Sequence, residues 1–92
     1  MIVRISGEGQ FRLPDEDSDR LNELDNRAVS AVEQGEETGF QELWSQMLEL
    51  VSGDGNRIGD DELVESDVIL PPRDISFHEA KGEFNGDGLI PD

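Results

Sequence analysis

This 92-residue chain contains no cysteine, which excludes disulfide bonds and metal sites built from thiolates. Lysine and arginine together number only 7, against 23 aspartates and glutamates, so the formal net charge is −16. Nucleic acids and anionic lipid headgroups are recognised by clusters of basic side chains, and the basic residues here are scattered. We therefore expect neither direct nucleic-acid binding nor binding to anionic membrane surfaces.

Long apolar segments are also lacking. The N-terminal apolar run ends at Arg4, too early for the hydrophobic region of a signal peptide. No stretch approaches the ~20 apolar residues of a membrane-spanning helix. We therefore expect a cytoplasmic protein without direct membrane insertion.

The pattern of apolar residues predicts a single α+β domain over residues 1–92. Apolar residues around a glycine-rich turn predict a β-hairpin over residues 1–13. Helical spacing on each side of Gly35 predicts a helical hairpin over residues 18–52. The expected segments after it are an acidic loop at 53–62, a strand at 66–70, a short helix at 76–84 and a tail at 85–92. We expect a small antiparallel sheet, made of the hairpin plus one strand, packed against the helical hairpin and the short third helix.

Two helix starts carry the spacing of a capping box, in which a Ser or Thr is followed three residues later by Glu or Gln. Thr38 with Gln41 fits this pattern at the second long helix, and Ser76 with Glu79 fits it at the short helix. Both pairs therefore predict the residue at which a helix begins.

No set of side chains indicates catalysis. His78 is the only histidine, and the neighbouring Glu79 is not placed to orient its ring on a helix. The carboxylates are too numerous for one acid–base pair to stand out. We predict a protein that is not an enzyme, has no catalytic residues and uses no cofactor.

The acidic loop nearly fits the pattern of a calcium-binding EF-hand loop. Its candidate ligands are Asp54, Asn56, Asp60 and Glu65. Ile58 stands where the pattern needs an oxygen ligand, and the residues after the loop indicate a strand rather than a helix. We therefore expect no metal site, and a calcium-responsive switch stays as an alternative function.

The strong acidity has two explanations. One is a general acidic bias, such as that of a salt-rich cytoplasm, and the other is a surface that meets a basic partner or imitates a nucleic acid. The acidic nucleic-acid mimic is therefore a second alternative function.

Trp44, the only tryptophan, lies in the middle of the second helical stripe with Phe40 and Met47. Core packing is one explanation, and an anchor for a partner protein is the other, because Trp and Met are enriched at interfaces. The apolar stripe on each helix is wider than the packing of two helices against each other requires, so the extra width packs on the sheet or on a partner. Phe40, Trp44 and Met47 are therefore the partner-binding candidates.

The order and spacing of several segments resemble the PspA-associated protein family (PspAA). These segments are Met1-Ile2-Val3-Arg4-Ile5, Gly7-Glu8-Gly9-Gln10, Leu21-Asn22-Glu23-Leu24-Asp25, Leu63, Ser66-Asp67, Leu70-Pro71-Pro72 and Gly88-Leu89-Ile90-Pro91. One departure is Lys81-Gly82, where a more helix-favouring stretch is expected.

Members of this family accompany the phage-shock protein A (PspA) coiled coil in bacterial and archaeal membrane-stress systems. The resemblance implies a non-enzymatic adaptor or regulator that binds a PspA-type coiled-coil protein and reaches the membrane periphery through it. It supplies no catalytic residues, and it leaves the oligomeric state and the direction of regulation open.

Overall fold

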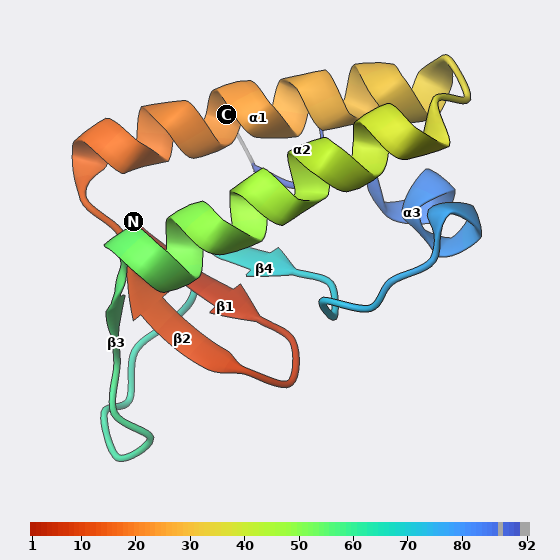
Figure 1. The fold of residues 1–92 in the computed structure, drawn as a ribbon. Coiled ribbons are helices and arrows are strands. Elements are labelled where there is room, and N and C mark those ends of the chain that lie inside the picture. The colour runs from red at the N-terminus through yellow and green to blue at the C-terminus, as the bar shows by residue number, and fades with distance from the viewer. Residues whose placement is uncertain (87, 91–92) are drawn as a thin grey trace.

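The computed structural model describes residues 1–86 and 88–90, and it shows two long helices lying across one face of a four-stranded sheet (Figure 1). The strands are β1 (Ile2–Ile5), β2 (Gly9–Arg12), β3 (Asn56–Arg57) and β4 (Val68–Leu70), and their order in the sheet is β3-β2-β1-β4. The helices are α1 (Asp15–Glu33), α2 (Glu37–Glu49), a π-helical turn η1 (Leu50–Asp54) and α3 (Phe77–Glu83). Of the expected tail, residues 87, 91 and 92 lie outside the described part.

The α+β class is confirmed: a β-hairpin and further strands form a sheet, and a helical hairpin and a short third helix pack with it. The expectation of an antiparallel sheet needs one correction, because β4 runs parallel to β1, with Val3 opposite Val68. An additional strand, β3, pairs antiparallel with β2. Since β3 and β4 point the same way, the chain between them has to return across the sheet before β4 begins.

Local sequence explains where the helices start and stop. α1 begins at Asp15, directly after Pro14, and three acidic residues occupy its first turn, where negative charge interacts favourably with the helix dipole. Gly35, with φ of 72°, lies in the turn that follows. The amide of Glu36 donates to the carbonyl of Ala31 at 2.9 Å. This bond across a left-handed glycine is that of a Schellman motif.

The two expected capping boxes have different outcomes. At α3, the amide of Glu79 donates to the Ser76 hydroxyl oxygen at 3.1 Å, and the Glu79 carboxylate accepts from the Ser76 amide. This box is confirmed, and α3 continues through Lys81-Gly82 to Glu83. At α2 the expected box is wrong, because the helix starts at Glu37 without a side-chain cap. The Schellman turn already sets this start, one residue before Thr38.

The core lies between the sheet and the helices. The inner face of the sheet contributes buried side chains such as Val3, Ile5 and Phe11, and the long helices contribute the apolar stripes expected from the sequence. No helix within the described residues is long and apolar enough to cross a membrane.

Candidate interaction surfaces

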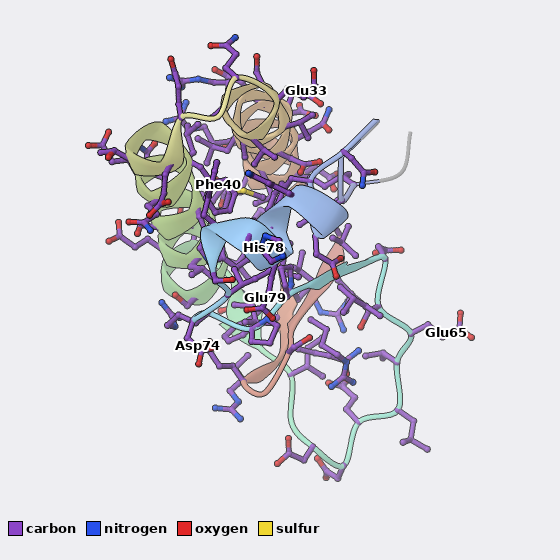
Figure 2. All side chains as sticks on the ribbon, turned by 90° about the vertical axis from the view of Figure 1, so that its right-hand side faces the viewer. Glu33, Phe40, Glu65, Asp74, His78 and Glu79 are labelled. Carbon is purple, nitrogen blue, oxygen red and sulfur yellow. The ribbon has the colours of Figure 1, made fainter. Side chains whose placement is uncertain are left out.

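The three partner-binding candidates on α2 lie in the core. Phe40, Trp44 and Met47 are only 1%, 5% and 0% exposed. The ring of Phe84, at the end of α3, stands edge-on to those of Phe40 and Trp44, at centroid distances of 5.0 and 5.7 Å. Figure 2 shows Phe40 between α2 and α3. The chain therefore covers Phe40 and Trp44 with its own third helix and the residue that follows it, and a partner reaches these two side chains only if that segment moves.

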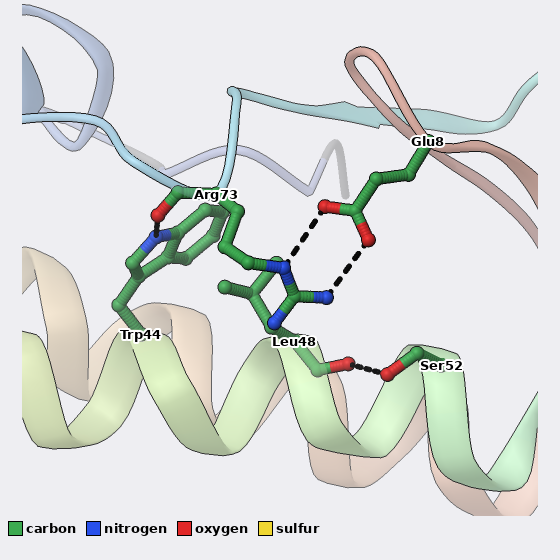
Figure 3. A network of polar contacts seen from close by, with 5 residues as sticks. All are labelled: Glu8, Trp44, Leu48, Ser52 and Arg73. Atoms are coloured by element: carbon green, nitrogen blue, oxygen red, sulfur yellow. Dashed lines mark hydrogen bonds and ion pairs between the residues drawn. The ribbon is translucent and has the colours of Figure 1, made fainter.

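The segment between β4 and α3, residues 71–76, which we call the strap, holds Trp44 in place (Figure 3). The indole Nε1 of Trp44 donates to the carbonyl of Arg73 at 3.2 Å. The Arg73 guanidinium donates to both carboxylate oxygens of Glu8, at 3.0 and 2.8 Å, and these bonds lower the pKa of Glu8. The ion pair is exposed, so it contributes little to stability, but it links the strap to the β1–β2 turn.

The candidate calcium ligands are used differently from an EF-hand loop. Asp54 ends the π-helical turn, and Asn56 lies in β3, paired with β2. Ile58 is 5% exposed but lies outside the main core cluster, and its amide donates to the carbonyl of Gln10 at 2.9 Å. Asp60 and Glu65 are exposed, and Figure 2 shows Glu65 pointing away from the body of the protein. Within residues 1–86 and 88–90, no group of three or more Asp, Glu or His side chains is placed to hold a metal ion.

A buried carboxylate that the sequence did not single out holds the C-terminal segment. Asp25 of α1 is 0% exposed. Its carboxylate oxygens accept from the amide of Leu89 at 3.1 and 3.0 Å and from the amide of Ile90 at 3.0 Å. Burial raises the pKa of Asp25, and these hydrogen bonds partly oppose that rise. An aspartate inside an apolar stripe, between Leu24 and Ala28, is the sequence signal for such a contact.

The connection from β3 to β4 crosses the face of the sheet that the long helices leave uncovered. Gln10 alternates with the inward-facing Phe11 and therefore points to this outer face. Its Nε2 donates to the carbonyl of Val64 at 3.0 Å and to the hydroxyl of Ser66 at 2.8 Å. Gln10 is 8% exposed, so the crossing segment covers it and is fixed by it.

Two large apolar side chains are exposed among the described residues. Leu63, in the crossing segment, is 97% exposed, and Ile69, in β4, is 61% exposed. His78 is exposed on α3 (Figure 2). Glu79 is engaged with Ser76 in the capping box, so its carboxylate is not available to orient the imidazole.

Two hollows lie along the seam between α1 and α2. One, of about 360 Å³, is lined by residues that include Arg27, Glu42 and Gln46. The other, of about 350 Å³, is lined by residues that include Arg20, Gln46 and Glu49. Gln46 lines both hollows, so they are neighbours along the seam, and we call the two together the α1/α2 groove.

Comparison with known proteins gives one match. The family described as PspA-Associated protein (PspAA) matches residues 1–92, the whole chain. Neither the curated proteins nor the solved structures contain a match to this chain.

Proposed function

Because the chain belongs to the PspA-associated protein family, we propose that it is a non-enzymatic adaptor or regulator that binds a PspA-type coiled-coil protein in a membrane-stress response. The observation that carries this proposal is the family match over residues 1–92. The protein acts in the cytoplasm and reaches the membrane periphery through this partner.

The segments that carry the family resemblance support a role as a folded binding module. Asp25, from the 21–25 segment, accepts hydrogen bonds from the tail segment at Leu89 and Ile90. Gln10 holds the crossing segment through Ser66, and the Asp67 carboxylate accepts from the first strand. These segments thus hold the fold together, and the partner meets other parts of the surface.

The charge of −16 suits an association steered by electrostatics. A partner with basic stretches is attracted at long range, and salt screens this attraction over a Debye length of ~10 Å at 0.1 M. We therefore expect binding to weaken as salt is added, chiefly through a slower association rate.

The test is direct binding between purified full-length proteins. The 92-residue chain is titrated by isothermal calorimetry against the PspA-type protein encoded in the same genome, at low and at physiological salt. A saturable complex that co-elutes in size-exclusion chromatography is expected. An unrelated acidic protein of similar size and charge is the control, because it reveals non-specific attraction. Absence of a complex at micromolar concentrations of both proteins would refute the proposal.

A further inference from the structure

We propose that the α1/α2 groove binds one helix of a heptad-repeat partner, with acidic side chains of that helix facing α1 and basic side chains facing α2. This inference rests on the proposed function, because the PspA-type protein is the partner that supplies the helix.

The groove has the length and position of a helix-binding seam. α1 and α2 run side by side above the sheet (Figure 1), and their buried stripes are already covered by the sheet and α3. α2 contains 13 residues, which corresponds to roughly 20 Å at 1.5 Å per residue. The two hollows meet at Gln46, so a partner helix of about four turns could follow the seam.

The lining of the groove repeats every seven residues. On the α1 side the repeating residues are Arg20, Arg27 and the C-cap residue Gln34. On the α2 side the repeating pairs are Gly39 with Gln46, Glu42 with Glu49, and Leu43 with Leu50, the first residue of η1. Residues seven apart lie on nearly the same side of a helix, with a drift of ~20°. A helix with its own heptad repeat would therefore meet equivalent positions at each turn of contact.

The two walls of the groove carry opposite charge. The α1 wall carries Arg20 and Arg27, and the α2 wall carries Glu42 and Glu49. Among residues 1–86 and 88–90, only Arg20 of these four makes an ion pair, a long one of 3.9 Å to the exposed Glu23. The charged side chains of the two walls form no ion pair across the groove, so both sets remain available to a partner. Charges flanking a coiled-coil seam set the choice and orientation of the partner.

Gly39 lines the end of the groove nearest the α1–α2 turn. Because it has no side chain, it does not narrow the groove there. Glycine destabilises a helix interior relative to alanine, yet nothing in the fold requires it at this position. A Cβ at Gly39 would lie 3.6 Å from its nearest neighbour, Glu36, which is an ordinary contact. The absence of a side chain here permits close approach of a partner helix instead.

The first test replaces the charges of one wall. Glu42→Lys/Glu49→Lys should weaken binding to the full-length PspA-type protein at least roughly tenfold, because a basic flank of the partner would then face like charge. The control is Glu33→Lys/Glu65→Lys, which changes the net charge equally at exposed positions that line neither hollow and that Figure 2 shows far from each other. The control should lose less than about threefold in affinity, because only the long-range electrostatic steering of the partner is weakened.

The second test fills the groove without weakening the fold. Gly39→Gln adds a long side chain at the end of the groove nearest the α1–α2 turn and replaces a glycine by a better helix former, so we expect it to block the groove without destabilising α2. Gly82→Gln in α3 is the matched control, because Gly82 is also a helical glycine and has no atom within 4 Å of an added Cβ. Circular dichroism of both variants checks that the helices are intact.

The third measurement identifies the occupant. A photo-crosslinking residue, p-benzoylphenylalanine, replaces Gln46 in the groove or Glu65 outside it. From Gln46 we expect crosslinks to PspA positions spaced by three, four or seven residues, and from Glu65 none with this pattern. Crosslinks from Gln46 only to a second copy of this chain would overturn the inference.

The outcomes separate the two proposals. If the wild-type protein does not bind, both the function and the groove assignment fall. If it binds, but the groove variants match their controls, the assignment to the groove is wrong while the proposed function stands.

Discussion

The contact between Asp25 and the C-terminal segment makes a quantitative prediction for Gly88→Ala. Gly88 has φ of 85°, a conformation that costs a residue with a Cβ about 1 kcal/mol or more. A Cβ at this position would also lie 2.5 Å from Oδ2 of Asp25, so the carboxylate or the segment would have to move. The hydrogen bonds to the amides of Leu89 and Ile90 would then be lost.

The matched control is Gly86→Ala. Gly86 also has a positive φ, of 58°, but an added Cβ there would have no neighbour within 4 Å. Both variants bear the conformational cost, and only Gly88→Ala bears the clash with Asp25. The difference between them therefore isolates the contribution of this contact.

The size of the difference follows from the bonds that are lost. A hydrogen bond to a charged group contributes about 1.5–3 kcal/mol, and two amides depend on Asp25, that of Leu89 in a partly buried contact and that of Ile90 in a buried one. We expect Gly88→Ala to lower the free energy of unfolding by about 3 kcal/mol more than Gly86→Ala does. For a domain of this size, that corresponds to a difference in Tm of roughly 12–24 °C.

Thermal and urea unfolding followed by circular dichroism measures this difference. Hydrogen exchange adds a local readout, since the amides of Leu89 and Ile90 should lose protection in Gly88→Ala and keep it in Gly86→Ala. If the two variants unfold within about 0.5 kcal/mol of each other, Asp25 does not stabilise the fold through this segment.

Four further predictions concern charge, burial and metal binding. The Tm should rise with monovalent salt between 0.01 and 1 M, because the Debye length shortens from ~30 to ~3 Å and screens the repulsion within a protein of charge −16; a flat or falling Tm would contradict this. Trp44 fluorescence should already be blue-shifted in the free protein, since this side chain is 5% exposed, and red-shifted emission would place it in solvent. Calorimetry should detect no calcium affinity tighter than millimolar, and saturable micromolar binding abolished by Glu65→Gln would revive the calcium switch. The pKa of Asp25 is raised in the folded state from 3.8, so the free energy of unfolding should fall as pH rises from that value through the raised pKa, because ionising the buried carboxyl costs more in the folded than in the unfolded chain. The stability advantage of wild type over Asp25→Asn in urea unfolding should therefore shrink across that window, and an advantage that grows with pH would show the opposite shift.

The elements that depend on neighbouring residues in sequence could be predicted. The helical stripes, the stop at Gly35 and the capping box at Ser76 are local features, and the structure contains all three. The start of α2 was misplaced because the Schellman turn and the Thr38 box compete for the same few residues, and sequence spacing alone does not rank them.

The parallel pairing of β4 could not be predicted, because it depends on contacts between distant segments. Residues 58–67 carry few apolar side chains, and their path across the outer face is fixed by Gln10 and its bonds to Val64 and Ser66. A glutamine in a strand normally indicates a solvent-facing position. Only the tertiary structure shows that another part of the chain covers it.

Trp44 illustrates why a binding surface is harder to predict than a core. An aromatic residue in the middle of an apolar stripe has the same pattern whether a partner or another part of the chain covers it. Here Phe84 and the strap with Arg73 cover it. The helix between them, α3, contains Gly82, which lowers its helix propensity. The α1/α2 groove has the opposite pattern, since its lining is mostly polar and its seven-residue repeat lies at the edges of the stripes. Such a repeat becomes informative only when the structure shows that Arg27 of one helix and Glu42 of the other line the same hollow. A search for partner sites in small acidic proteins should therefore compare the edges of apolar stripes on adjacent helices, as well as their centres.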